Sequence, residues 1–348
     1  MPRNVPQRKA RQQLPSDCRF TWLDGERVVV FRQGAMRGSL GILHEHGWDR
    51  FELLTTSRAL LEAPLELADA ASAVHEVGQG PVARIAAELI DSVTVPTLVA
   101  LGGGRVIDTA KAIAAVRGGR VAVLPTTLSG AEMTRIHRLP EGHRAPHLVR
   151  PGLVVADPPE MTALPEDPLR ASAMNALAHG AEALYTPLAN PFGTLAALRG
   201  ATLIAGALDQ APEDRDPAAL ALGSLLCAYA MDGAGYALHH VVCQTLVQAL
   251  GTPHAETNAT MLPRTMEAMR SRAPEAITAL ADALGTDGNG LSARIEALGG
   301  GPRRLAAPGV DPPRLDEALD AILAREQLAR TPDPPGRDEL RELIEGAL

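Results

Sequence analysis

The sequence is poor in aromatic residues, in cysteine and in lysine. Aromatic side chains make up only 3% of the 348 residues, so Ala, Leu, Val and Ile must build the hydrophobic core. The three cysteines, Cys18, Cys227 and Cys243, are too few and too widely spaced for a disulfide framework or a zinc site. We therefore expect a cytoplasmic protein. Lysine occurs only at Lys9 and Lys111, which draws attention to Lys111.

A basic surface and a long apolar run are also missing. The net charge of −8 argues against the clustered basic face of a nucleic-acid-binding protein. We find no uninterrupted apolar run long enough to span a bilayer. Residues 1–20 are expected to form a flexible tail, because their basic start lacks the apolar core of a secretory signal. The expected partner is a small molecule, not a nucleic acid or a membrane.

Up to about residue 160, short apolar runs alternate with helical patterns. The expected strands are 27–31, 51–56, 96–101, 121–127 and 152–157, and the expected helices among them are 39–47, 81–90 and 106–118. This alternation indicates βαβ units and a mostly parallel sheet. We expect an α/β domain over 21–160.

After Leu164 the strand signals nearly vanish. The expected helices are 167–186, 191–208, 216–234, 235–250, 254–272 and 274–284, followed by shorter ones. The chain is also longer than most single hydrophobic cores. We therefore expect a separate all-α domain over 161–348.

A glycine-rich turn joins a strand to a helix in PTLVALGGGRVIDTAKAIA (96–114). Gly102, Gly103 and Gly104 would let the backbone approach a bulky anion, and the helix start offers unpaired N–H groups. A pyrophosphate suits such a turn. The motif is neither GxGxxG nor a P-loop, and a tight turn without a ligand explains the glycines equally well.

A second loop, in VLPTTLSGAEMT (123–134), follows the next strand and carries the hydroxyl groups of Thr126, Thr127 and Ser129. In an open α/β sheet, ligands bind at the carboxyl ends of the strands. Two such loops in successive units favour a dinucleotide more than either does alone. The strand end at Thr56 has no acidic residue for a ribose hydroxyl, so NADH and NADPH both stay open.

The helical half carries polar pairs at one-turn spacing. Asn175 and His179 are four residues apart, and His240 and Gln244 repeat that spacing on another helix. His254 follows a Gly-Thr-Pro breaker and is expected to begin the next helix. These side chains could converge on one point. Any one of the histidines, taken singly, is explained as well by an interior hydrogen bond.

Four motifs together resemble the iron-containing alcohol dehydrogenase superfamily, and most of all its maleylacetate reductase branch. In chain order they are GGGRVIDTAKAIA, PTTLSGAEMT, MNALAHGAEALY, and LHHVVCQ with LGTPHAETNATMLP. The resemblance covers residues 25–348. It implies a dehydroquinate synthase-like fold, with a Rossmann-like dinucleotide-binding domain, an all-α catalytic domain and an active site in the cleft between them. It also implies NAD(P)H as cofactor and a homodimer.

The resemblance assigns the glycine-rich turn to the pyrophosphate and the second loop to the nicotinamide. Asp108 and Lys111 would lie in or near the turn and the helix behind it. Lys111 is explained equally well as a packing and charge partner of Asp108. The candidate cofactor-binding residues are Gly102, Gly103, Gly104, Asp108, Lys111, Thr126, Thr127, Ser129 and Thr56.

Asn175 and Gln244 are two of the positions that depart from the family pattern. In metal-dependent members one Asp and three His hold Fe²⁺ or Zn²⁺, and these positions fall on Asn175, His179, His240 and His254. Asparagine removes the only anionic ligand, which weakens the site, although three histidines can still hold zinc. Gln244 stands where relatives typically carry histidine, and because glutamine cannot titrate, a proton relay through this position is lost.

We predict an NAD(P)H-dependent oxidoreductase, similar to maleylacetate reductase, that transfers a hydride to a small oxo or unsaturated acid. The candidate catalytic residues are His239, His240, Asn175 and Gln244, with His239 as the proton donor. Two alternatives stay open. One is a metal-dependent alcohol dehydrogenase, and the other is a diverged member with a non-redox or biosynthetic role.

Overall fold

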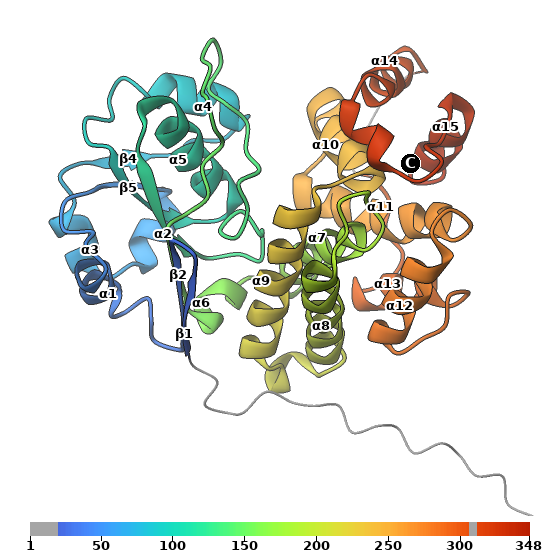
Figure 1. Cartoon of the computed structure of the whole chain (residues 1–348), viewed down its shortest axis with the longest axis horizontal. Coiled ribbons are helices and arrows are strands. Elements are labelled where there is room, and N and C mark those ends of the chain that lie inside the picture. Colours follow the sequence, from blue (N-terminus) through green and yellow to red (C-terminus); the bar gives the residue numbers. More distant parts are fainter. Residues whose placement is uncertain (1–19, 306–311) are drawn as a thin grey trace, which may run out of the picture.

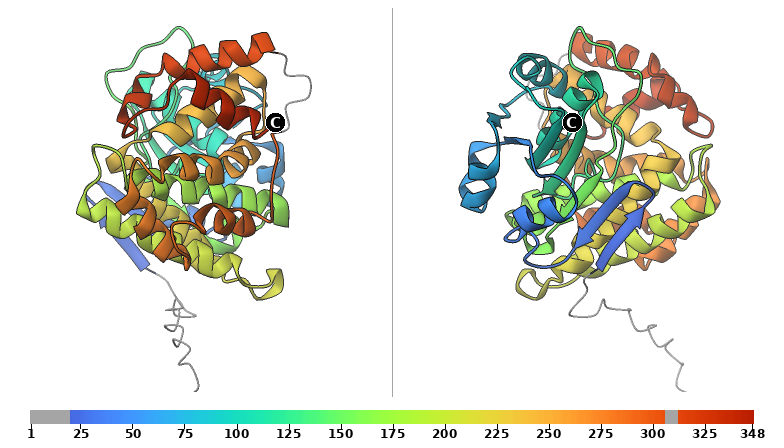
Figure 2. Two further views of the ribbon diagram at one scale, coloured as in Figure 1. Left: turned by 90° about the vertical axis from the view of Figure 1, so that its right-hand side faces the viewer. Right: turned by 60° about the vertical axis from the view of Figure 1, so that its left-hand side comes forward.

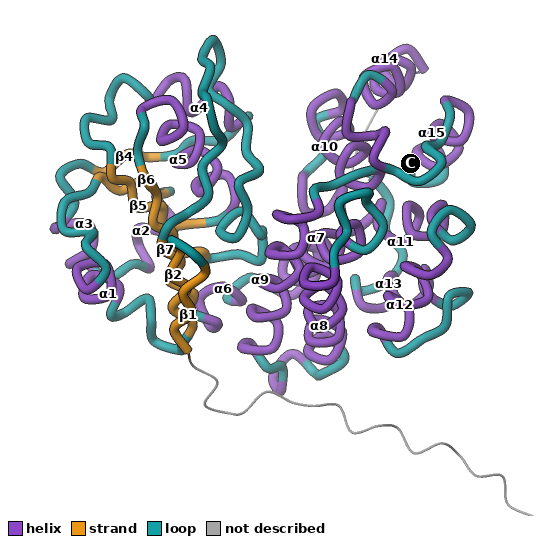
Figure 3. Tube along the Cα trace, in the orientation of Figure 1, coloured by secondary structure: helices purple, strands orange, loops and turns teal. Residues whose placement is uncertain are grey.

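The computed structural model describes residues 20–305 and 312–348, so the tail expected at 1–20 lies almost wholly outside the described residues. A seven-stranded sheet with flanking helices occupies one side of the molecule, and a group of helices occupies the other (Figures 1 and 3). This arrangement confirms the expected α/β part followed by an all-α part.

The sheet has the strand order β1-β2-β7-β6-β5-β3-β4. Only β1 and β2 pair antiparallel, and every other neighbouring pair is parallel. The β1–β2 hairpin forms one edge and comes forward in the right-hand panel of Figure 2. The strands are β1 (Phe20–Asp24), β2 (Arg27–Phe31), β3 (Glu52–Thr55), β4 (Val74–Glu76), β5 (Thr97–Gly102), β6 (Arg120–Pro125) and β7 (Leu153–Ala156).

Sequence patterns found the five interior strands and missed the two edge strands. β4 has only three residues, none of which is buried, so it lacks the apolar run of an interior strand. The edge strands β1 and β4 each pair with one neighbour only. The hydrogen bonds to that neighbour, more than side-chain burial, therefore define β4 as a strand.

Alternate residues of the central strands face opposite sides of the sheet. In β5, Leu98 and Ala100 pack into one hydrophobic cluster, and Val99 and Leu101 pack into another. The helices α4 (Val82–Leu89) and α5 (Gly104–Arg117) cover the first face, and α1 (Ser39–Glu45), α2 (Ser57–Glu62) and α3 (Leu65–Ala70) cover the second. Both faces are thus buried, as a parallel sheet requires.

The helical part begins after β7. Its helices are α6 (Pro158–Thr162), α7 (Glu166–Ala183), α8 (Pro191–Leu208), α9 (Pro217–Ala234), α10 (Leu238–Leu250), α11 (His254–Met269), α12 (Pro274–Leu284), α13 (Leu291–Leu298), α14 (Pro312–Leu323) and α15 (Arg337–Glu345), with short 3₁₀ turns η1 (Pro212–Asp214) and η2 (Glu326–Arg330). The first six helices expected after Leu164 lie within a few residues of these bounds, and α11 begins at His254 as predicted.

Small residues let α7, α8 and α9 pack closely. The core of these helices is therefore filled without large aromatic side chains. A Cβ atom at Gly200 would lie 2.7 Å from the carbonyl oxygen of Gly223 and 2.6 Å from the Cys227 sulfur. A Cβ atom at Gly180 would lie 2.8 Å from the same sulfur. The helices are therefore in near-backbone contact, and larger side chains would force them apart.

The two parts share one hydrophobic cluster. It contains Val154 and Ala156 of β7 together with Leu177 and Ala178 of α7. All strands of the described residues end by Ala156. The division into domains 21–160 and 161–348 stays a prediction, since the core runs across that boundary.

Two helices, α8 and α9, are long and apolar enough to cross a membrane by length and composition. In the fold they pack on each other and on α7. About half of α8 and 61% of α9 is buried inside the protein. They are core helices of the helical part, and the few charged residues in them reflect that burial.

Candidate active site

The loops that follow β5 and β6 pack directly against each other at the carboxyl edge of the sheet. A Cβ atom at Gly103 would lie 3.0 Å from Thr127 Cγ2, and one at Gly104 would lie 2.9 Å from Ser129 Cβ. The Thr126 amide also donates to the Gly102 carbonyl at 3.1 Å. Close approach of the second loop therefore requires glycine in the first.

The helix α5 begins at this turn without a side-chain cap. Its N-cap is Gly103, whose carbonyl accepts from the amides of Val106 and Ile107. Within the described chain, the amides of Gly104 and Arg105 have no acceptor, and the buried Nε of Arg105 is also unpaired. Unpaired donors at the positive end of a 14-residue helix suit a phosphate group. Arg105 was missed in the sequence, although it directly follows the three glycines.

Thr56 lies at the same edge, where β3 runs parallel to β5. Its hydroxyl oxygen accepts the Ala59 amide at 3.2 Å and so caps α2. This bond leaves the hydroxyl hydrogen as the only donor that Thr56 can offer to a ligand.

Lys111 is fully buried and holds the second loop in place. Its ammonium group donates to the carbonyls of Ala131 at 2.9 Å and Ile136 at 3.0 Å, and it lies 2.8 Å from an Asp108 carboxylate oxygen. Lys111 therefore makes two hydrogen bonds to backbone carbonyls and one ion pair, all within the protein. The geometry thus favours the charge-partner explanation of Lys111 over direct contact with a nucleotide.

A buried acid, Glu132, sits in the second loop and was not singled out in the sequence. Ser129 Oγ donates to one of its carboxylate oxygens at 3.2 Å, and the other oxygen has no partner in the described part of the chain. Burial raises the pKa of Glu132 to about 7. The loop therefore contains a carboxyl group that titrates near neutral pH.

The second loop is also in direct contact with the helix that carries Asn175 and His179. The Asn175 amide donates to the Ser129 carbonyl at 3.3 Å. Gly130, with φ +76°, lies so close to His179 that an added Cβ would be 2.7 Å from its ring. The structure thus joins the candidate nucleotide loop to the candidate substrate residues.

The histidines of the helical part gather around His240. Its ring stacks on His179 with centroids 4.9 Å apart, and His239 meets it edge-on at 5.1 Å. Burial, reinforced by the charge that His254 would carry, lowers the pKa of His240 to about 3. Burial and the neighbouring histidines hold the pKa of His179 well below its usual value. Both rings are therefore neutral at physiological pH.

Glu182 fixes the orientation of His240 and was overlooked in the sequence. One oxygen of this fully buried carboxylate contacts His240 Nδ1, and the other accepts the amides of Ala237 at 3.0 Å and His239 at 2.8 Å. Burial raises the pKa of Glu182, while these amide donors oppose the rise. With Nδ1 engaged, the buried Nε2 of His240 is left without a partner among the described residues. The spacing in the sequence could have pointed to Glu182, because it follows His179 by three residues and so lies on the same face of α7.

His239 is fully buried, and both of its ring nitrogens are bonded within the protein. Nε2 lies 2.9 Å from Asn258 Oδ1, and Nδ1 lies 3.0 Å from Thr265 Oγ1. Burial lowers the pKa of His239 to about 3. A neutral ring that donates from Nε2 and accepts at Nδ1 satisfies both partners. This geometry favours a structural role for His239 over the proton-donor role expected from the sequence.

Gln244 lies on α10, one turn after His240, and its side chain is half-buried. Its Oε1 accepts from Arg325 Nη2 at 2.9 Å, and the same nitrogen donates to the Tyr236 hydroxyl at 3.0 Å. Sequence reasoning identified Gln244 but missed Arg325, which is 81 residues further along the chain.

The C-terminal half of the chain, residues 170–348, matches the model of the C-terminal part of the Fe-containing alcohol dehydrogenase family. The chain belongs to this iron-containing alcohol dehydrogenase family. Membership makes the protein an oxidoreductase and confirms the resemblance found in the sequence. The family as a whole implies a nicotinamide cofactor and iron.

Relatives within the iron-containing alcohol dehydrogenase family extend the match over nearly the whole chain. Maleylacetate reductase 1 of Rhodococcus opacus is 36% identical over 72% of this chain and 72% of its own length. Maleylacetate reductase of Rhizobium sp. strain MTP-10005 is 31% identical over 94% of this chain and 97% of its own. The crystal structure of maleylacetate reductase from that Rhizobium strain superposes with a TM-score of 0.79 at 28% identity, covering 95% of this chain and 98% of that one. The fold class predicted from the sequence is confirmed.

In this member of the family, the residues at the metal position lack the anionic ligand that favours tight binding of a divalent ion. Asn175 Oδ1, His179 Nδ1 and His240 Nε2 are buried without partners, but all belong to neutral groups. Across residues 20–305 and 312–348, no three His, Cys, Asp or Glu side chains are grouped closely enough to hold a metal. His254 is exposed at the start of α11 and contacts Asn258 instead. A hard cation would have no anionic ligand among these four residues.

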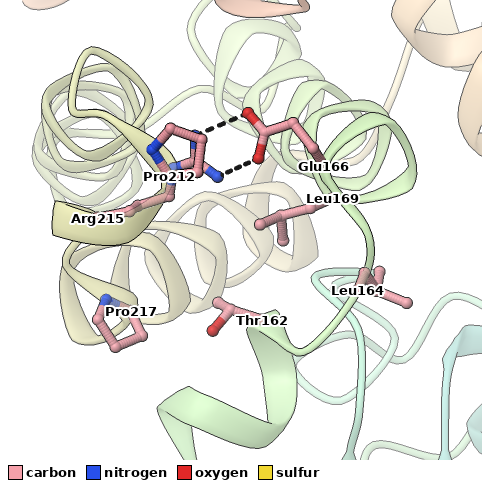
Figure 4. Close-up of a pocket in the computed structure, with 7 residues that line it drawn as sticks. All are labelled: Thr162, Leu164, Glu166, Leu169, Pro212, Arg215 and Pro217. Atoms are coloured by element: carbon pink, nitrogen blue, oxygen red, sulfur yellow. Dashed lines mark hydrogen bonds and ion pairs between the residues drawn. The ribbon is translucent and has the colours of Figure 1, made fainter.

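A separate pocket lies between α6, α7 and the start of α9 (Figure 4). Arg215 binds Glu166 there through two bonds of 2.6 and 2.8 Å, and Arg215 and Arg170 hold the pKa of Glu166 near 2. None of the predicted site residues lines it; the lining residues are Thr162, Leu164, Glu166, Leu169, Pro212, Arg215 and Pro217. Because Arg215 and Glu166 pair with each other, the opposite charges that line this pocket have a structural explanation.

Proposed function

We propose that the protein uses NAD(P)H to reduce a small oxo or unsaturated acid, in the manner suggested by its maleylacetate reductase relatives. One observation carries this proposal. The loop expected at the nicotinamide contacts α7 through the hydrogen bond between Asn175 and Ser129 and through the packing of Gly130 on His179. A nucleotide held by this loop would therefore present its reactive end to the histidines.

The nucleotide side is built largely from backbone groups. Gly102 to Gly104 and the unpaired amides at the start of α5 would hold the pyrophosphate, with Arg105 as an additional donor. Thr126, Thr127 and Ser129 would line the nicotinamide side, and Asp108 and Lys111 would support the loop from behind. When bound, the nucleotide supplies the hydride, and solvent water supplies the proton that completes the reduction.

The substrate side would orient a hydroxyl group of the substrate or product through neutral groups. The unpaired Nε2 of His240 and Oδ1 of Asn175 are hydrogen-bond acceptors, and Glu182 keeps His240 in one orientation. Neutral groups can fix the position of the substrate, and they avoid the free-energy cost of removing water from a buried charge. Because this donor set lacks an anionic ligand, the proposed reaction does not depend on a metal ion.

The direct test is to follow NADH and NADPH oxidation at 340 nm with maleylacetate, with a panel of related oxo and unsaturated acids, and with simple alcohols and aldehydes. We expect turnover of an acid by the protein after dialysis against a chelator. Activity on alcohols that depends on added metal would favour the metal-dependent alcohol dehydrogenase alternative instead. Nucleotide binding without turnover of any compound would favour a non-redox role.

Two further expectations stay proposals. A homodimer is suggested by the resemblance to the family, and sedimentation of the purified protein tests it. A cytoplasmic location is suggested by cysteine usage, and fractionation of cells that express the full chain tests it.

A further inference from the structure

The proposed reaction leaves Arg325 without a role. This residue lies between α14 and η2, and η2 contacts α10. Its guanidinium is half-buried and makes three hydrogen bonds, to Gln244, Tyr236 and, at 3.4 Å, Gln327. All three acceptors are neutral oxygen atoms.

The absence of an acidic partner distinguishes Arg325 from several other arginines of the helical part. Arg272 pairs with Glu339, and Arg337 pairs with Asp316 and Asp320. In residues 20–305 and 312–348, Arg325 forms no ion pair, and its Nη1 atom has no hydrogen-bond partner. It is thus a positioned guanidinium whose charge is not neutralised. Such a group can bind a carboxylate through paired hydrogen bonds.

The guanidinium lies beside the histidine cluster. Tyr236, which accepts one of its hydrogen bonds, has its ring 6.0 Å from that of His240. Gln244, which accepts another, follows His240 by four residues and therefore lies on the same face of α10. Both acceptors thus place Arg325 next to the group proposed to contact the substrate.

This geometry explains why glutamine suits position 244. An amide oxygen can hold a guanidinium in place without cancelling its charge, whereas a carboxylate would pair with it and a protonated histidine would repel it. Gln244 and Tyr236 therefore act as positioning residues for Arg325.

We propose that Arg325 binds a carboxylate of the substrate, held for this purpose by Gln244 and Tyr236. The inference rests on the proposed reduction of an acid at the same site and adds which residue recognises the acid group. It predicts that the substrate carries a carboxylate that is distinct from the carbon that receives the hydride, and that neutral analogues are poor ligands.

The test compares four variants of the full-length protein with maleylacetate as substrate and glutarate as a non-reacting dicarboxylate probe. Arg325→Gln removes the charge, and Arg325→Lys keeps it without the paired donors. Gln244→Glu preserves the size of the side chain but supplies an anion that pairs with Arg325. The matched control is Arg330→Gln, which removes a positive charge from the other end of η2.

We expect Arg325→Gln and Gln244→Glu each to raise KM for maleylacetate and Kd for glutarate by at least about tenfold, with a smaller change in kcat. Arg325→Lys should show an intermediate effect, and Arg330→Gln should resemble the unmodified protein. NAD(P)H affinity, measured by fluorescence, and Tm should change little in all four, because a merely structural role would shift Tm as well.

Glutarate binding separates this inference from the proposed reaction. Suppose that the unmodified protein does not reduce maleylacetate and yet binds glutarate at least about tenfold more tightly than Arg325→Gln does. That result would reject the proposed reaction and support the proposed carboxylate site. Equal glutarate affinity in the unmodified protein, Arg325→Gln and Gln244→Glu would overturn the carboxylate site, whatever the turnover.

Discussion

The two sides of the candidate site use different kinds of chemical groups. On the nucleotide side, three glycines, unpaired backbone amides and small hydroxyl groups lie on two adjacent loops of one sheet. On the substrate side, pairs of side chains from separate helices meet, such as Glu182 with His240 and Arg325 with Gln244. Local backbone geometry shapes the first side, and long-range helix packing shapes the second.

This difference indicates how each side can change. A backbone site depends on residues that are small enough to allow close approach, so most side chains added there obstruct it. A site made of side-chain pairs can exchange both partners and keep its geometry, as double replacements of interacting groups often do. The departures at Asn175 and Gln244 both lie on the substrate side, which agrees with this view.

The largest effect is expected where the two sides meet. Gly130→Ala adds a Cβ atom 2.7 Å from the His179 ring at a residue with φ +76°. We expect a loss of about 3 kcal/mol in the free energy of unfolding, from backbone strain together with overpacking, and a loss of most activity. Urea unfolding and NAD(P)H oxidation measure the two effects.

Gly142→Ala is the matched control for Gly130→Ala. Gly142 also has φ +76°, but an added Cβ would meet nothing within 4 Å. It should lose only the strain component, about 1 kcal/mol, and keep its activity. Equal losses in the two variants would show that contact between loop and helix does not matter.

On the nucleotide side, Glu132 should make stability depend on pH. Its pKa is raised to about 7 from 4.5 in the unfolded chain, so its neutral form stabilises the fold fully below pH 4.5. That contribution is lost as the pH rises through 7 and amounts to about 3 kcal/mol. Glu132→Gln should remove this dependence of the free energy of unfolding on pH, and it should raise that free energy above pH 7.

The measurement is the free energy of unfolding in urea at several pH values between 4 and 8. Glu141→Gln, at an exposed position, serves as the control and should leave the slope unchanged. A pH profile of Glu132→Gln identical to that of the unmodified protein would contradict an acid that is buried and neutral.

A smaller effect is expected for the glycine turn itself. Gly104→Ala places a Cβ atom 2.9 Å from Ser129 Cβ and pushes the two loops apart. We expect Kd for NAD(P)H to rise by about tenfold, or about 1.4 kcal/mol, while glutarate affinity is kept. Gly41→Ala, where a Cβ atom meets nothing within 4 Å, should leave nucleotide affinity unchanged.

The smallest effect is expected from metal removal. Because Asn175 contributes no charge to the neutral donor set, dialysis against a chelator should change activity by less than about twofold. Asn175→Asp supplies the missing anion, and its affinity for zinc, measured by competition with a chromophoric chelator, should exceed that of the unmodified protein by about tenfold or more. Loss of activity on chelation of the unmodified protein would contradict the neutral site.

Much of the fold could be predicted from the sequence because its signals are local. The interior strands are continuous apolar runs, and breakers at Pro217 and Gly251 mark the start of one helix and the end of another. The strand β4 could not be found this way, since three unburied residues carry no pattern of their own. Its identity as a strand depends on pairing with β3.

Within the site, the sequence by itself determined the glycine turn, the hydroxyl loop and the family, because those features lie in short contiguous stretches. Only the tertiary structure decided what the isolated polar residues do. His239 turned out to be enclosed by Asn258 and Thr265, and Gln244 to be the partner of Arg325. Hydrogen bonds between residues that are distant in the chain leave no periodic trace in sequence, since only folding brings the partners together.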